Sequence, residues 1–240
     1  MQRIYRKEQQ RENIVFFNLY RRAAEREINM DLKGKKINFL GDSITEGHGT
    51  SGKDRIFLNL LKEREGLKEA RNYGIGGTRI ANQMGEDDMA PSYCQRFCEM
   101  DDDADIIVVF GGTNDYGHGN APLGTFASIT PDTFYGACRY LIEGLMEKYP
   151  TSLIVFMAPL HRKDDASPSM GNREPLETYV KIIREVCEYY SIPLLDLYKT
   201  LGICPNVEIS RVTYCPDGLH PNDAGHELIY SRLAGFLKSL

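Results

Sequence analysis

The clearest strand signal in this sequence is the run Asp105-Ile106-Ile107-Val108-Val109-Phe110-Gly111. It places β-branched and apolar residues between an acidic turn and a pair of glycines. A strand that is apolar on both faces is typical of a parallel sheet covered by helices on both sides. The run therefore predicts an α/β fold.

The segments around this run alternate between strand and helix patterns. Further strands are expected at residues 36–41, 71–75, 152–158 and 192–197, and helices at residues 54–65, 81–99, 132–148, 174–190 and 223–240. This alternation predicts an α/β sandwich with a central five-stranded parallel sheet and right-handed crossovers. No internal repeat or linker is visible, so we expect one domain over residues 34–240.

Residues 1–33 form a separate N-terminal extension in this interpretation. Apolar residues recur at three- or four-residue spacing at positions 14, 17, 20, 24 and 28, which predicts a long amphipathic helix. A basic amphipathic helix can lie on a membrane surface, but four Glu residues interrupt the basic face here. We favour a helix that packs on its own domain or on a second subunit, as in a homodimer.

Composition excludes several classes of function. The formal net charge is −5, so the chain lacks the basic footprint of a nucleic-acid binder. No run of about 18 apolar residues suggests a membrane span. No signal peptide is visible, and the six cysteines fit reduced thiols in a cytoplasmic protein. A Cys204–Cys215 pair is the alternative for an exported protein, and Cys94 and Cys98 lack the second pair that a zinc site needs.

Polar, glycine-rich segments follow three of the expected strands, and a fourth precedes the last helix. They cover residues 41–47, 74–78, 111–115 and 217–222. Ligands of open α/β sheets bind outside the carboxyl ends of the strands. The convergence of these segments on one edge of the sheet indicates a functional site.

Ser43, Asp217 and His220 have the chemistry of a nucleophile and its base. Ser43 lies at a strand-to-helix turn, where a serine can also act as a helix cap. Asp217 precedes His220 by three residues, so its carboxylate can hold one imidazole nitrogen and leave the other as a base. The Asp217–His220 pair alone favours a histidine that caps the following helix, but with Ser43 on the same edge of the sheet it predicts a serine nucleophile and its base. The G-x-S-x-G motif of α/β-hydrolases is not present.

An acyl-transfer site also needs hydrogen-bond donors for the oxyanion. The N–H group of Gly77, the side-chain amide of Asn114 and the N–H group of Ser43 are candidates. Taken alone, Gly77 is better explained by turn geometry and Asn114 by a turn that its side chain forms.

Four sequence blocks in order resemble those of the SGNH hydrolases, also called the GDSL lipase/esterase family. The blocks are Gly41-Asp42-Ser43-Ile44, Gly77 within Asn72-Tyr73-Gly74-Ile75-Gly76-Gly77, Gly112-Thr113-Asn114-Asp115 and Asp217-Gly218-Leu219-His220-Pro221. The resemblance covers residues 36–240, and Ile44 replaces the Leu of the family block.

The resemblance implies a flavodoxin-like three-layer fold with no metal and no organic cofactor. It assigns Ser43 as nucleophile, His220 as base and Asp217 as the residue that orients His220. It also assigns the oxyanion hole to Gly77, Asn114 and the Ser43 N–H group.

Four neighbouring residues are less directly implicated. We expect Asp42 and Asp115 to hold loops together by accepting backbone hydrogen bonds. His161 follows the expected strand 152–158, and His118 lies just beyond Asn114. Both are candidates for substrate contact, and a surface or structural role is the alternative for each.

Two other functions are compatible with parts of the sequence. Residues 47–53 fit the G-x-x-x-x-G-K pattern of a phosphate-binding loop, but Asp54 replaces the Ser or Thr that binds magnesium. The preceding strand also ends about six residues too early. A binding module without activity would be expected to have lost Ser43, Asn114, Asp217 or His220, and all four are present.

The sequence therefore predicts hydrolysis of a small or short-chain acyl ester through an acyl-enzyme. An acetylated carbohydrate is the first candidate substrate. An acyltransferase with the same site, a lysophospholipase and a thioesterase are the alternatives.

Overall fold

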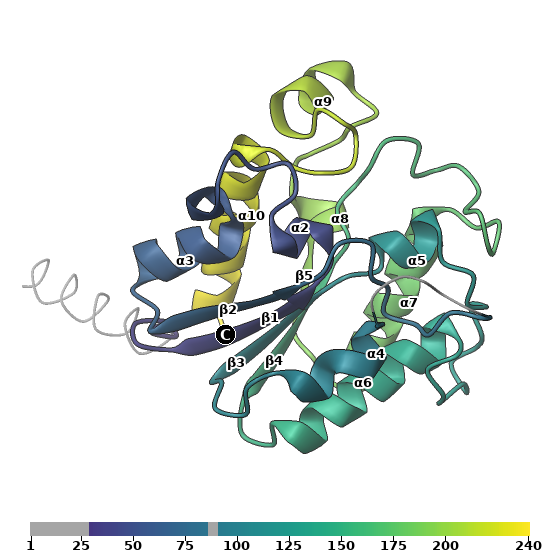
Figure 1. Cartoon of the computed structure of the whole chain (residues 1–240), viewed down its shortest axis with the longest axis horizontal. Coiled ribbons are helices and arrows are strands. Elements are labelled where there is room, and N and C mark those ends of the chain that lie inside the picture. Colours follow the sequence, from purple (N-terminus) through teal and green to yellow (C-terminus); the bar gives the residue numbers. More distant parts are fainter. Residues whose placement is uncertain (1–28, 86–90) are drawn as a thin grey trace, which may run out of the picture.

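The computed structural model describes residues 29–85 and 91–240. Its centre is a five-stranded, all-parallel sheet with the strand order β2-β1-β3-β4-β5 (Figure 1). The strands are β1 Lys36–Gly41, β2 Glu69–Gly74, β3 Ile106–Phe110, β4 Leu153–Ala158 and β5 Leu194–Asp196. The expected five-stranded parallel sheet is confirmed, and each expected strand is present within one to two residues at its ends.

Helices cover both faces of the sheet (Figure 1). One face carries α3 (Phe57–Glu65) and α10 (Asp223–Lys238), and the other carries α4 (Tyr93–Arg96), α6 (Phe134–Lys148) and α7 (Leu176–Tyr189). Alternate side chains of β3 point to opposite faces, so Ile107 and Val109 join one hydrophobic cluster and Val108 joins the other. This arrangement confirms the expected three-layer sandwich.

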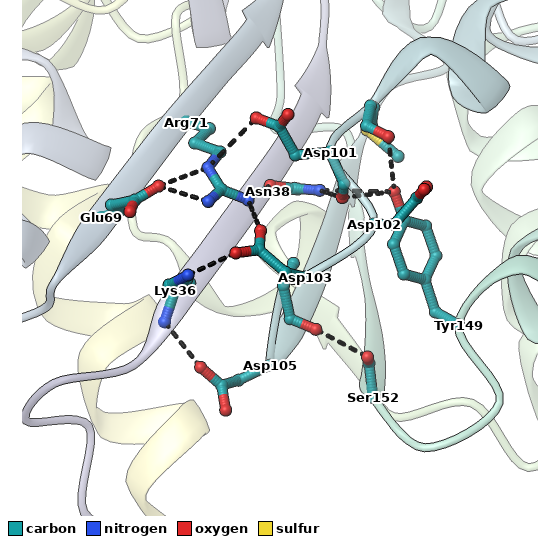
Figure 2. A network of polar contacts seen from close by, with 12 residues as sticks. Lys36, Asn38, Glu69, Arg71, Asp101, Asp102, Asp103, Asp105, Tyr149 and Ser152 are labelled. Atoms are coloured by element: carbon teal, nitrogen blue, oxygen red, sulfur yellow. Dashed lines mark hydrogen bonds and ion pairs between the residues drawn. The ribbon is translucent and has the colours of Figure 1, made fainter.

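A polar network ties together the ends of the strands opposite the candidate site (Figure 2). The guanidinium of Arg71 on β2 contacts Asp101 at 3.2 Å and Asp103 at 2.6 Å in the loop before β3. Asn38, fully buried in β1, donates to the carbonyl oxygen of Asp101 at 2.8 Å. The buried amide is therefore satisfied, and three neighbouring segments are joined on this side of the sheet.

The helix expected over residues 81–99 is shorter in the structure. Among the described residues of this stretch, 81–85 are not helical, and within 91–99 the helical residues are those of α4 and of the 3₁₀ turn Phe97–Glu99. The Asp115 carboxylate accepts the N–H groups of Ile80 and Ala81 at 3.0 Å, which holds this stretch in a loop. Ser92 then begins α4 with a capping box, directly after Pro91.

Several short helices surround the loops at the carboxyl ends of the strands. They are α2 (Ser43–Glu46), α5 (Thr113–Gly117), α8 (Leu197–Thr200), α9 (Glu208–Tyr214) and the 3₁₀ turn Lys53–Arg55. Helices α8 and α9 occupy the long connection before α10, for which the sequence pattern predicted no element.

The N-terminal extension is described only at its end. The amphipathic helix expected from positions 14–28, and any homodimer contact through it, lie outside the described residues. The last part of the extension contacts the domain, because the N–H group of Met30 donates to the Lys238 carbonyl oxygen at 2.9 Å and the Leu32 side chain is buried.

Candidate active site

The candidate site lies at the point where the order of the strands reverses. Strand β1 lies between β2 and β3, so the connections leaving β1 and β3 run to opposite sides. Such a switch point leaves a crevice outside the carboxyl ends of the two strands. Ser43 directly follows β1, and Asn114 follows β3. The topology therefore brings together two residues that lie far apart in the sequence.

Ser43 is the first residue of α2. The Asp42 carboxylate caps this helix by accepting the N–H group of Ile44 at 3.0 Å, and Gly47 ends it with φ of +112°. The N–H group of a first helical residue has no acceptor within its helix. Ser43 thus presents a hydroxyl and an N–H donor at the same turn, and its side chain is buried, with 6% exposure.

Ser43, His220 and Asp217 form a continuous hydrogen-bonded chain. The Oγ atom of Ser43 lies 2.9 Å from Nε2 of His220, and Nδ1 of His220 lies 2.7 Å from Oδ2 of Asp217. Because an ionised carboxylate only accepts hydrogen bonds, Nδ1 carries the proton and Nε2 faces the serine hydroxyl as an acceptor. This is the arrangement in which an imidazole can remove the serine proton.

The turn before α10 holds Asp217 in its ionised form. Its second oxygen, Oδ1, accepts the N–H groups of Leu219 at 2.8 Å and of His220 at 2.7 Å. Partial burial alone would raise the pKa of Asp217, but these hydrogen bonds and the His220 ring outweigh it and lower the pKa below its ordinary value. The carboxylate therefore remains charged next to the imidazole at neutral pH.

The three expected oxyanion donors lie around the same cavity. It has a volume of about 390 Å³ and is lined by Ser43, His48, Gly76, Gly77, Asn114, Gly117, His118, Arg162, Leu219 and His220. The Asn114 amide is oriented by a 3.0 Å hydrogen bond from Nδ2 to the carbonyl oxygen of Thr78. Gly77 has φ of +75°, a conformation that favours glycine. The structure thus places Gly77, Asn114 and Ser43 beside one another.

Asp42 and Asp115 accept backbone hydrogen bonds, as expected. Asp42 bonds Ile44, and Asp115 bonds Ile80 and Ala81. Burial raises the pKa of Asp42 to about 7 and that of Asp115 to about 6.

Of the two histidines expected near the substrate, His118 lines the cavity and His161 does not. His118 lines the cavity, and its Nδ1 atom lies 3.0 Å from Nη1 of the buried Arg79. Arginine can only donate, so Nδ1 of His118 is the acceptor and its proton is on Nε2. His161 does not line this cavity: it pairs with Asp165 at 2.6 Å and stacks on Tyr198 with ring centroids 3.8 Å apart.

Two polar side chains of the cavity wall, His48 and Arg162, were not predicted from the sequence. His48 lies beside the His220 ring, with centroids 5.5 Å apart, and its Nε2 atom is 3.3 Å from Oε2 of Glu46. Arg162 follows β4 one position after His161. Its place in the loop after β4 is the same sequence signal that made His161 a candidate.

Thiols and metal ligands do not form a second centre in the part of the chain that the structure describes. All six cysteines are free thiols. No group of three or more His, Cys, Asp or Glu side chains is arranged to hold a metal ion in residues 29–85 and 91–240. None of the described helices is long and apolar enough to cross a membrane.

Comparison with known protein families identifies the family of the chain and the class of reaction. The model of the GDSL-like lipase/acylhydrolase family matches residues 39–228, which is most of the chain. The chain belongs to this family. As a GDSL-like hydrolase it is a carboxylic ester hydrolase, and the matched region contains Ser43, Gly77, Asn114, Asp217 and His220.

Several solved structures share the fold of this chain. A protein from Lactobacillus plantarum is 31% identical with a TM-score of 0.76, over 86% of this chain and 98% of that one. A "possible lipase" from Chitinophaga pinensis, 24% identical over 84% of this chain and 96% of its own, shares the fold with a TM-score of 0.63. A two-domain esterase active on acetylated mannans, 18% identical over 92% of this chain and 52% of its own, shares the fold with a TM-score of 0.59. No curated protein matches this GDSL-like sequence.

Proposed function

We propose that this GDSL-like hydrolase cleaves a small or short-chain acyl ester through an acyl-enzyme on Ser43. The observation that carries the proposal is the chain of two hydrogen bonds from Ser43 Oγ through the His220 ring to Asp217. It opens into a cavity whose volume suits a small molecule.

The first half-reaction forms the acyl-enzyme. His220 Nε2 removes the proton from Ser43 Oγ as this oxygen attacks the ester carbonyl carbon. The developing oxyanion accepts hydrogen bonds from the N–H groups of Ser43 and Gly77 and from the Asn114 amide. Asp217 stabilises the imidazolium that forms, and His220 then gives its proton to the departing alcohol oxygen.

The second half-reaction restores the enzyme. A water molecule takes the place of the alcohol and loses a proton to His220 Nε2 as its oxygen attacks the acyl carbon. Collapse of the second tetrahedral intermediate breaks the bond to Ser43 Oγ, which regains its proton from His220 and releases the acid.

The lining of the cavity favours a short acyl group on a polar alcohol. Among the described residues that line it, Leu219 alone has a large apolar side chain, and His48, His118, Asn114 and Arg162 supply polar groups. A long acyl chain needs an apolar channel to stabilise it. An acetyl ester of a carbohydrate fits this lining, and the acetylated-mannan esterase performs such a reaction on the same fold.

Intact-protein mass spectrometry after treatment with a fluorophosphonate tests the nucleophile. We expect one adduct on the wild-type protein, none on Ser43→Ala, and a strongly slowed reaction on His220→Ala. Circular dichroism should show that all three proteins are folded. A folded wild-type protein that forms no adduct would contradict the proposal, and so would an adduct that persists on Ser43→Ala. Product analysis with and without added alcohol then separates hydrolysis from acyl transfer.

A further inference from the structure

The guanidinium of Arg162 is held in the wall of the candidate active-site cavity. Its Nη1 atom lies 3.2 Å from the carbonyl oxygen of Thr113 and 3.4 Å from Thr113 Oγ1. Its Cζ atom lies over the Tyr116 ring, 5.4 Å from the centroid. A Cβ atom on Gly117 would lie 2.7 Å from Nη1, so the glycine leaves the space that the guanidinium fills. Helix α5, which carries Asn114, thus fixes the position of this cation.

Arg162 has no carboxylate partner in the described part of the chain. No Asp or Glu oxygen of residues 29–85 and 91–240 lies within 4.0 Å of its nitrogens. The nearby carboxylates have other partners: Asp165 pairs with His161 and accepts from Asn206, and Asp217 pairs with His220. Of the five N–H groups of this guanidinium, only those on Nη1 have an acceptor in the same part of the chain.

The rest of the described cavity lining carries no carboxylate of its own. The described lining contains one arginine and three histidines but no aspartate and no glutamate. The protein as a whole has a net charge of −5, so this local composition is opposite to the overall balance. Burial lowers the pKa of Arg162 from its ordinary value, and this effect outweighs the opposing attraction of Asp165, Asp42 and Asp217, none of which bonds the guanidinium.

We propose that Arg162 binds an anionic group of the substrate, so that the ester carries a carboxylate or a phosphate beside the bond that is cleaved. A guanidinium presents a planar fork of donors that matches either group through two parallel hydrogen bonds. The inference rests on the proposed function, because it concerns the substrate of the same cavity. On a carbohydrate, this chemistry corresponds to an acylated sugar acid or sugar phosphate.

A purely structural role for Arg162 predicts a different outcome. Its contact with Thr113 adjoins Asn114, so the guanidinium could simply hold the oxyanion donor in place. In that case, removal of Arg162 would slow charged and neutral esters equally. Anion recognition affects the charged ester alone.

Matched ester pairs separate the two roles. The first pair is 4-acetoxybenzoate and its methyl ester, which differ in charge on the alcohol side. The second pair is the 4-nitrophenyl monoester of succinate and 4-nitrophenyl butyrate, which differ on the acyl side. For each ester, kcat/KM is divided by the rate constant for hydroxide hydrolysis, which corrects for intrinsic reactivity. We expect the wild-type protein to favour the anionic member of one pair at least about tenfold, and the pair identifies the half of the ester that carries the charge.

Variants then assign this preference to Arg162. Arg162→Gln should lower kcat/KM for the anionic ester by roughly 10- to 100-fold, mainly through KM, while the neutral partner changes less than about threefold. Arg162→Lys should recover part of the loss, since the charge remains but the fork is gone. Arg232→Gln, which removes an exposed arginine on α10, controls for the change in net charge and should have no effect.

Inhibition distinguishes the two anions. Glucuronate and glucose 6-phosphate are compared with glucose as competitive inhibitors of methyl 4-acetoxybenzoate hydrolysis. The inference is supported if one of the two anions inhibits, glucose does not, and the inhibition is lost in Arg162→Gln. The anion that inhibits then identifies the group as a carboxylate or a phosphate. If Arg162→Gln lowers kcat/KM equally for the anionic and the neutral ester of every pair, the inference is overturned. A wild-type protein that does not prefer the anionic ester of either pair would also overturn it. Turnover that persists in Ser43→Ala would instead contradict the proposed function.

Discussion

The Nε2 atom of His220 lies 2.9 Å from the Oγ atom of Ser43, although 177 positions separate the two residues in the sequence. Two contacts hold their loops together. Ser51 donates its N–H group to Oδ1 of Asp223 at 2.8 Å and its hydroxyl to Oδ2 at 2.6 Å. Gly49 lies directly against the backbone of Pro221. The loop after α2 is therefore joined to the turn that carries His220.

Removal of the proposed nucleophile or the proposed base should abolish most turnover. We expect Ser43→Ala and His220→Ala each to lower kcat for 4-nitrophenyl acetate by at least roughly 1000-fold. Asp217→Asn keeps the shape of the side chain but can present an N–H donor to Nδ1 of His220, which favours the wrong tautomer of the imidazole. We expect this variant to lower kcat by up to about 10⁴-fold. Steady-state kinetics give these values, and thermal unfolding shows whether the variants fold. Near-wild-type turnover by folded Ser43→Ala would rule out the mechanism.

The Asn114 amide should act in the transition state and not in substrate binding. We expect Asn114→Ala and Asn114→Asp to lower kcat by roughly 100- to 1000-fold with little change in KM, because the donor acts on the oxyanion. The aspartate variant is the control for volume, since it keeps the size of the side chain and loses the donor. A change confined to KM would place Asn114 in substrate binding instead.

Gly49→Ala should displace His220 relative to Ser43. Gly49 has φ of +90°, and a Cβ atom there would lie 2.4 Å from the Pro221 carbonyl oxygen and 3.2 Å from His220 Cβ. A displacement on the order of 1 Å can cost about 100-fold in rate, so we expect kcat to fall by roughly 10- to 100-fold in a folded protein.

Gly52→Ala is the matched control in the same loop. Its backbone is extended, and a Cβ atom there meets only the movable side chain of Asp54. Equal activity losses in the two variants would argue against a specific displacement of His220.

Asp42 should make the folded protein less stable as the pH rises. Burial raises its pKa from an ordinary value of 3.8 to about 7. Between these two values the folded protein retains a proton that the unfolded chain has lost, so the free energy of unfolding falls as pH increases through this window. Asp42→Asn cannot ionise and still accepts the N–H group of Ile44.

Denaturant unfolding at pH 5 and pH 8 measures this effect. The free energy of unfolding of Asp42→Asn minus that of the wild-type protein should increase from pH 5 to pH 8. A difference that stays constant between the two pH values would mean that Asp42 is already ionised in the folded state.

Acyl chain length should be limited by the polar cavity. From 4-nitrophenyl acetate to the octanoate, kcat/KM should fall by at least about tenfold, since added methylene groups find little apolar wall. Initial rates below the critical micelle concentration of the longer ester provide the measurement. A preference for octanoate would point to an apolar acyl site and against a short-chain esterase.

The sequence by itself determined the five strands and the residues that meet at their carboxyl ends. A run such as residues 105–111 is apolar on both faces, and a strand of this kind is stable only inside a covered sheet. Parallel strands bring the loops at their carboxyl ends to one edge of the sheet. The sequence therefore also determined that the blocks containing Ser43, Gly77, Asn114 and His220 meet there.

Only the tertiary structure decided which side chains face the cavity and where the loops are helical. His161 and Arg162 are adjacent after β4, yet Asp165 and Tyr198 hold the first away from the cavity while Thr113 and Tyr116 hold the second in its wall. Likewise, residues 81–85 do not form a helix, because Asp115 accepts the N–H groups of Ile80 and Ala81 from 35 and 34 positions away. These outcomes depend on contacts between distant segments, which local periodicity does not encode.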